Sequence, residues 1–370
     1  MAPRPRRPTA SDLGSLFLWV AAVGLVLLPA AGVFRRVWAI PRPDSALERV
    51  DPLREWSGLI AAGHTLLWCS LIGFVAAMLA LVWAWWMRGL GPRARVWAMG
   101  MGLAPLLLPS YLAYAGWNLL RSPGTWLGDT LAVLPPWTSV WAGRAMAIGG
   151  LSLWVWPLAL LLLAPAAARI PESILEAMRS DGAGRRRRMW ECLRLLAGDL
   201  WRAGGLCALV MAGSAIPLHV AQVHTYSIYL WSEMNRVPDV RGVWLASWPA
   251  LLVALAGAVW VVGLVTRRAR GPSSAEGDAG PAPLSARSRQ RGSAVLLTGC
   301  ACCIWSASVL VPLLLFVLSV REPSAYPGFW REAGDGVLAS SHIGVWVGVI
   351  GAAALLAAWL SAANRPPPPL

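Results

Sequence analysis

Residues 169–200 read RIPESILEAMRSDGAGRRRRMWECLRLLAGDL. This stretch is polar and rich in arginine, yet long runs without Asp, Glu or Arg lie on both sides of it. Eight such runs in the chain are long enough to cross a bilayer, which takes about 20 apolar residues. A charged segment of this length between two membrane spans must lie outside the bilayer. We therefore interpret it as a docking element for a soluble partner.

The composition of the chain predicts an all-α polytopic membrane protein. Hydrophobic residues make up 57% of the chain and charged residues only 14%, whereas a soluble domain has about 25% charged residues. A lipid-exposed backbone must satisfy its own hydrogen bonds, so the spans are expected to be helices. The eight expected spans are residues 13–34, 58–87, 96–120, 144–168, 203–223, 242–266, 292–320 and 337–363.

The arginines predict the orientation of these spans. All 32 basic residues are Arg. With a cytoplasmic N-terminus, about two thirds of them fall on the cytoplasmic side, as the positive-inside rule requires. The net charge of +14 is then a property of the cytoplasmic loops, and it gives no reason to expect a nucleic-acid partner.

The expected spans and loops divide the chain into four parts. Residues 1–57 hold a basic tail, the first span and a polar external loop, and residues 58–266 hold the next five spans. Residues 267–291 are dominated by Gly, Pro, Ser and Ala, which predicts a disordered cytoplasmic linker. Residues 292–370 hold the last two spans.

The second and eighth spans carry a faint internal repeat. His64 precedes Trp68 by the same spacing that separates His342 from Trp346. One interpretation is that the chain from about residue 292 onward is a second copy of the N-terminal part that stops after two spans, since repeats are common in transporters. The other is a chance likeness between two apolar helices.

Local signals predict a helical hairpin within residues 169–200. Pro171 and Glu172 form a helix start, with proline at the first position and an acid in the first turn. Gly182 and Gly184 end this helix, which is too short to span a membrane. A basic helix start follows at 185–188 and leads into the fifth span. A partner that pushed on this rigid knob would move the fourth and fifth spans together.

The first helix of the hairpin is amphipathic. Ile174, Leu175 and Met178 share one apolar side, which we expect to be buried. Glu176 and Arg179 project elsewhere on the helix.

The hairpin also resembles a known motif. Its residues are similar to the EAA loop of permeases from binding-protein-dependent ATP-binding-cassette importers, in which Glu-Ala-Ala is followed after three residues by Gly. Met178 stands where the family has its second Ala, and the aliphatic-x-Leu-Pro that ends the family's loop lacks its Pro in the Cys192–Leu195 stretch, which puts the loop exit in doubt. The matching residues are Glu176, Ala177 and Met178, followed by Asp181, Gly182 and Ala183.

Three further stretches extend the resemblance. His64-Thr65-Leu66 is similar to the Asn-Thr-Leu that opens the core of such permeases. Pro109 and Trp117 in the third span, with Ala215-Ile216-Pro217-Leu218 in the fifth, resemble the iron(III)- and thiamine-type permeases. Those proteins fuse two six-span halves, each with its own EAA loop. The likeness covers residues 58–266 well and residues 292–363 more weakly, so the resemblance makes 58–266 a permease core and 169–202 its coupling loop.

What the resemblance implies is solute import across the bacterial inner membrane. The coupling loop would dock into a dimer of separate ATPase subunits, and a periplasmic binding protein would deliver the solute. Iron(III) is the first expectation for the solute, with thiamine or a polyamine behind it. The chain lacks a G-x-x-x-x-G-K-[ST] motif, so it would be a transport subunit without a cofactor of its own, and ATP would bind the partner. Compared with the family, the second half is expected to be truncated, and the resemblance then implies a second permease subunit or a homodimer.

Polar residues at the outer ends of the spans are candidates for a solute path or gate. One interpretation is that they line the external gate and guide a metal or an oxyanion; the other is that they anchor the chain at the membrane interface. The six cysteines are most simply packing residues rather than a metal site. The path candidates are His64, His219, Gln222 and His224.

Two other functions stay open. The chain has a single EAA-like loop where the family has two, which is also compatible with a non-transporting scaffold or a permease remnant. A secondary carrier is the weaker alternative, because the spans hold no paired carboxylates of the kind that proton-coupled carriers use.

Overall fold

The computed structural model describes residues 52–221, 223–236, 240–269, 291–319 and 325–363. All described elements are helices, and no described residue lies in a β-strand. The chain splits into two compact units, one formed by Arg49–Ser319 and the other by Met1–Glu48 with Val320–Leu370. We call Arg49–Ser319 the core unit. The described element of the other unit is α14 (Ala325–Ala363), and each unit is described by itself.

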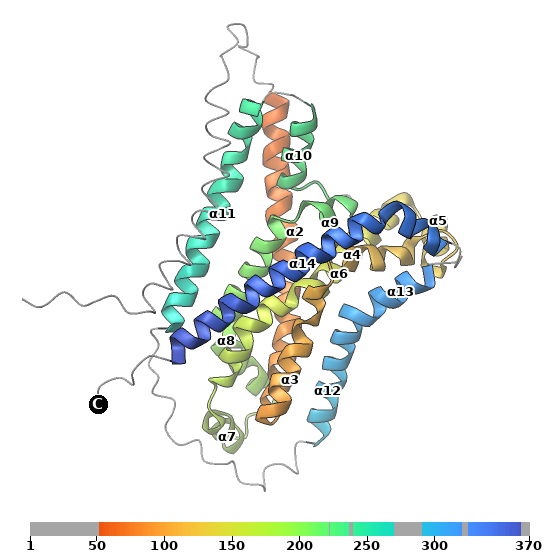
Figure 1. Ribbon diagram of the computed structural model, residues 1–370. Coiled ribbons are helices and arrows are strands. Elements are labelled where there is room, and N and C mark those ends of the chain that lie inside the picture. Colours follow the sequence, from red (N-terminus) through yellow and green to blue (C-terminus); the bar gives the residue numbers. More distant parts are fainter. Residues whose placement is uncertain (1–51, 222, 237–239, 270–290, 320–324, 364–370) are drawn as a thin grey trace, which may run out of the picture. The chain divides into compact units, whose positions relative to one another are not determined.

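The core unit is a bundle built on three long helices, α2, α6 and α8 (Figure 1). The other helices of the unit, most of them shorter, surround these three. The helices of the core unit are α2 (Pro52–Arg88), α3 (Pro92–Leu103), α4 (Ser110–Asn118), α5 (Trp126–Val133), α6 (Pro136–Ala168), α7 (Glu172–Ser180), α8 (Arg185–Ala212), α9 (Ala215–Val220), α10 (Tyr226–Arg236), α11 (Val240–Ala269), α12 (Arg291–Trp305) and α13 (Val311–Ser319).

The three long helices pack tightly because small residues lie where they cross. A Cβ added at Gly73 of α2 would overlap the carbonyl oxygen of Gly204 in α8, so the two backbones are in contact. Small residues allow this close approach in membrane helix pairs. Around the crossing, Trp156 and Leu160 of α6 are fully buried. The core of the unit is therefore the junction of α2, α6 and α8.

The third expected span, residues 96–120, is broken in the structure. Pro105 and Pro109 within this span predict a kink, and the structure confirms it, since Pro92–Leu107 and Ser110–Arg121 meet at a bend of 77°. The bend frees the carbonyl of Leu108, and the indole Nε1–H of Trp154 donates to it over 2.6 Å. A neighbouring helix thus satisfies the backbone group that the prolines leave without a partner.

The fifth expected span, residues 203–223, has different boundaries. α8 begins at Arg185, directly after Gly184, and runs for 28 residues to Ala212. This helix confirms the prediction that the basic residues 185–188 lead into the fifth span, and the two form one uninterrupted helix. The expected end at 223 is wrong because Gly213 closes α8 and Pro217 lies in the separate short helix α9.

The seventh expected span is continuous but not uniformly α-helical. A π-helical turn, Ser306–Leu310, joins α12 to α13 just before Pro312, which has no N–H to donate. Trp156 of α6 donates to the hydroxyl of Ser308 in this turn over 2.9 Å. Trp305 donates in the other direction, to the carbonyl of Met101 over 3.0 Å. Residues 292–319 are thereby attached to α3 and α6, while their assignment to a second permease half stays a prediction.

Several helices of the described chain are long and apolar enough to cross a membrane. Their number is four, or five if the bent pair counts as one span, which is compatible with a polytopic all-α membrane protein. The first expected span, 13–34, and most of the expected linker, 267–291, lie outside the described residues. The exact number of eight spans stays a prediction. The four helices are Gly58–Arg88, Pro136–Ala168, Arg186–Ala212 and Val295–Ser319.

Candidate functional site

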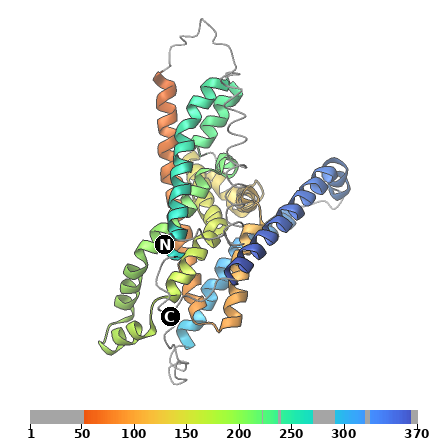
Figure 2. The ribbon, with the colours of Figure 1, turned by 60° about the vertical axis from the view of Figure 1, so that its left-hand side comes forward.

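The segment between α6 and α8 forms the predicted hairpin. α7 is a nine-residue helix that begins after Pro171, and α8 starts at Arg185. Figure 2 shows α7 and the beginning of α8 extending from the rest of the core unit. We call the end of the core unit that carries this hairpin the α7 end, and the opposite end, where α10 lies, the α10 end (Figure 1).

The hairpin turn depends on a glycine with a left-handed backbone. Gly182 has φ of +69°, and its N–H donates to the carbonyl of Arg179 over 3.1 Å. The N–H of Ala183 donates to the carbonyl of Met178 over 3.0 Å. These two bonds make a Schellman motif, in which glycine is favoured because other residues are strained at positive φ. The glycine of the EAA-like pattern therefore has a structural reason, which is to end α7 and reverse the chain.

A small apolar cluster fastens α7 to its neighbours. Leu175 is buried together with Ala166 and Ile170 before α7 and with Cys192 and Leu196 of α8. Met178 is half-buried, but Ile174 is 37% exposed. The prediction of a buried side that includes Ile174 is thus wrong. The apolar cluster is narrow, and Leu175 is the one residue of α7 within it.

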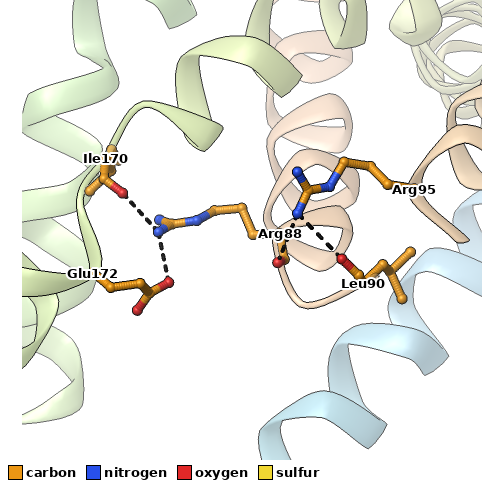
Figure 3. A network of polar contacts seen from close by, with 5 residues as sticks. All are labelled: Arg88, Leu90, Arg95, Ile170 and Glu172. Carbon is orange, nitrogen blue, oxygen red and sulfur yellow. Dashed lines mark hydrogen bonds and ion pairs between the residues drawn. The ribbon is translucent and has the colours of Figure 1, made fainter. Parts of the chain in front are cut away.

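Arg88, the last residue of α2, links this helix to the start of α7 (Figure 3). Its Nη2 donates to the carbonyl of Ile170 over 2.9 Å and to Glu172 Oε1 over 3.0 Å. The Arg88 side chain is 12% exposed, whereas that of Glu172 is 63% exposed. Arg88 also lies 4.9 Å from the ring centroid of Trp85. The buried partner, the carbonyl of Ile170, therefore accounts for most of the stabilisation, since exposed ion pairs contribute little.

A second arginine closes the end of α2. Arg95 of α3 donates to the carbonyls of Met87, Arg88 and Leu90 over 3.3 to 3.4 Å. The carbonyls of Met87 and Arg88 belong to the last turn of α2, where a helix leaves carbonyls without intrahelical partners, and Leu90 lies in the connection to α3. Figure 3 shows Arg88 and Arg95 side by side at this junction.

The remaining side of α7 faces outward. Glu176, Ala177 and Asp181 are exposed, as is Gly182, and Ala183 is half-buried. An exposed helix side on a fixed base is the arrangement that a docking helix needs, because a rigid surface loses little conformational entropy on binding.

The α10 end contains a cavity that brings two of the predicted path residues together. Its volume is about 230 Å³. His64 of α2 is half-buried there, and His224, in the connection between α9 and α10, is exposed. Arg144 of α6 lies in the same wall. The described residues that line it are His64, Leu67, Trp68, Trp141, Arg144, Val223 and His224.

Arg144 was not among the residues predicted for the site. The expected fourth span began at residue 144, which made Arg144 a boundary residue, but α6 begins at Pro136 and places it inside the helix. It is the single charged residue in this 33-residue helix. An isolated arginine within an apolar run is the signal that identifies it, because ionisable residues inside spans are usually functional.

The other predicted path residues lie elsewhere. His219 is exposed, with its ring 5.6 Å from that of Trp231, and it does not line the cavity. Gln222 lies outside the described residues. The structure therefore joins His64 to His224 and separates both from His219.

Thr65, next to His64, fixes the geometry of the cavity. Its Oγ1 donates to the carbonyl of Ala61 over 2.8 Å and accepts the N–H of Tyr226 over 2.7 Å. Tyr226 in turn donates its hydroxyl to the carbonyl of Ala246 in α11 over 2.7 Å, and burial raises the pKa of this phenol. α2, α10 and α11 are thus tied together beside the cavity.

Metal-ligating residues do not gather in the described part of the chain. Its histidines, cysteines and acids form no group of three or more that could hold an ion. Cys69, Cys192 and Cys207 are buried, as expected of packing residues, whereas Cys300, Cys302 and Cys303 are exposed.

Comparisons with known proteins give no family for this chain: no family model matches it, and no curated protein matches it.

Proposed function

We propose that this chain is a permease subunit of a bacterial ATP-binding-cassette importer, in which the α7–α8 hairpin docks on a separate ATPase subunit. The proposal rests on one observation above the others. The hairpin combines a fixed base, made by Leu175 and Arg88, with an exposed side that carries Glu176, Ala177 and Asp181. This arrangement suits a part that receives force from a soluble partner and passes it to the spans.

The connections of the hairpin support this role. α6 precedes α7 directly, and α8 continues without a break into the bundle. Arg169 pairs with Asp199 of α8 over 3.3 Å, which ties the entry of the hairpin to its exit. A displacement of α7 would therefore move α6 and α8 as a pair.

In this proposal the chain itself is not an enzyme and holds no cofactor, and ATP binds the partner ATPase dimer. A periplasmic binding protein delivers the solute, for which iron(III) is the first suggestion from the resemblance. A second permease subunit or a second copy of this chain supplies the other coupling loop. The proposed location is the inner membrane, with the α7 end in the cytoplasm, where the arginines of the hairpin would obey the positive-inside rule.

Co-purification with an ATPase tests the proposal. The full tagged chain is co-expressed with candidate ATPase subunits of its own genome and isolated in mild detergent. We expect one ATPase to co-purify with the wild type. The amount that co-purifies should fall by about tenfold or more in Glu176→Arg and Gly182→Arg, because each change alters the exposed side or the turn of the hairpin. Glu332→Arg is the matched control for Glu176→Arg, since Glu332 is exposed on α14 and the change in charge is the same.

Three results would count against the proposal. They are a wild type that retains no ATPase, equal retention in the hairpin variants, and equal loss in the control. Uptake that continues after ATP is depleted, while the proton gradient is kept, would favour a secondary carrier instead.

A further inference from the structure

We propose that the cavity at the α10 end is a binding site for a small oxyanion, with Arg144 as its principal ligand. This inference deepens the proposed function, and its meaning for transport rests on that function. The cavity volume of about 230 Å³ is below the range of about 300–1,000 Å³ that is typical of sites for drug-sized ligands. A small solute is therefore the occupant that fits.

The charge of Arg144 is held in place by aromatic rings. Its Cζ lies 5.1 Å from the ring centroid of Trp141 and 5.6 Å from that of Trp68. The two ring centroids are 6.5 Å apart. Aromatic faces attract a cation without supplying a hydrogen-bond acceptor. The guanidinium is thus positioned while its fork of N–H donors is left for an anion, which such a fork binds in bidentate fashion.

The other polar groups of the cavity fit the same ligand. His64 and His224 place imidazoles in the wall beside Arg144, and an imidazole offers an N–H donor in either protonation state. No carboxylate is among the described residues that line the cavity. Within this lining, the charge on Arg144 is therefore not neutralised, and an anion is attracted more strongly than it would be in water because the wall is largely apolar.

The same charge disfavours a bare metal cation. A ferric ion needs anionic oxygen ligands, and the lining supplies none, while Arg144 repels it. If iron is the solute, it would enter this cavity as an anionic complex. The cavity therefore narrows the solute class from a cation to an oxyanion, such as phosphate, sulfate or a small carboxylate.

Calorimetric titration of the purified full chain tests the site without any ATPase. The chain is placed in nanodiscs of phosphatidylcholine and titrated with inorganic phosphate, sulfate or citrate at constant ionic strength. We expect the wild type to bind at least one of these anions. The affinity should fall by about tenfold or more in Arg144→Gln and by less in Arg144→Lys, which retains the charge without the guanidinium fork. Arg93→Gln removes the same charge from an exposed residue of α3 and is expected to bind like the wild type.

A second variant guards against misfolding. His224→Ala changes an exposed residue in a connection rather than a span, and we expect it to weaken anion binding with an unchanged melting temperature. Nanodiscs that contain phosphatidylglycerol separate a lipid headgroup from a free anion. If the headgroup is the natural ligand, it lowers the apparent affinity for phosphate in the wild type and has no effect in Arg144→Gln.

Clear results would overturn the inference. One is the absence of anion binding in either lipid. Another is binding that is equal in the wild type and Arg144→Gln, and a third is binding of zinc chloride alone that depends on His64 and not on Arg144. Because no ATPase takes part, such a result would contradict the oxyanion site and leave the docking role of the hairpin to its own experiment.

Discussion

The two ends of the core unit hold their arginines in opposite ways. At the α7 end, Arg88 and Arg95 donate to backbone carbonyls, and Arg169 pairs with a carboxylate. At the α10 end, Arg144 lies against two tryptophan rings in a cavity where none of the described lining residues carries a carboxylate. The first set of charges is used to hold helices together. The second is held in position but not neutralised by the cavity wall, which is the difference between a structural cation and a binding group.

The largest effect is expected at the junction between the two ends. Gly73→Ala would force α2 and α8 apart, because its Cβ would overlap the backbone oxygen of Gly204. We expect a loss of about 3 kcal/mol in the free energy of unfolding, at the upper end of overpacking costs. The measurement is reversible unfolding in mixed micelles. Gly63→Ala is the matched control in the same helix, since a Cβ there meets no atom within 4 Å.

Equal stability of Gly73→Ala and Gly63→Ala would show that the contact between α2 and α8 at Gly73 is not tight. The α7 end and the α10 end would then be two regions that pack independently of each other.

The next prediction compares the two kinds of arginine directly. Arg88→Gln removes hydrogen bonds from a nearly buried guanidinium, and we expect it to cost about 2 kcal/mol of stability. Arg144→Gln removes only contacts with aromatic rings, so about 1 kcal/mol is expected. Unfolding of the two variants is measured side by side with Arg93→Gln as the exposed control. A larger loss for Arg144 than for Arg88 would contradict the distinction between structural and binding charges.

The smallest effect is expected at the hairpin turn. Gly182→Ala puts a Cβ on a residue with φ of +69°, which costs about 1 kcal/mol. Gly184→Ala serves as control, because Gly184 has φ of −60° and a Cβ there meets no atom within 4 Å. Hydrogen exchange of the amides of residues 172–184 reports the local loss. Equal exchange in the two variants would show that the left-handed turn does not hold α7.

The sequence predicted the parts of the fold that depend on local chemistry. Pro171, Glu172 and Gly182 marked the bounds of α7, and Pro105 with Pro109 marked the bend in the third span, because caps and prolines act within one or two turns. The sequence predicts that the fourth span begins at Arg144, because a charged residue often marks the edge of a membrane span. The helix α6 begins eight residues earlier, at Pro136. Because the predicted span began at Arg144, this residue was not recognised as part of the helix wall that lines the cavity.

The rest depended on contacts between distant parts of the chain. Ile174 and Leu175 are neighbours of similar hydrophobicity, and only the position of α8 decides that Leu175 is buried and Ile174 exposed. The pairing of His64 with His224 likewise follows from how α10 packs on α2. No pattern within α2 or within the connection that carries His224 contains this information.

The uninterrupted course of α8 has a mechanical consequence. At about 1.5 Å per residue, its 28 residues form a rod about 42 Å long. Gly204, where α2 crosses it, divides the rod into arms of about 28 Å and 12 Å. A rotation about this crossing would move the end at Arg185 more than twice as far as the end at Ala212. The helix is thus a lever with unequal arms, in which a wide swing at the hairpin becomes a shorter and more forceful movement at its other end.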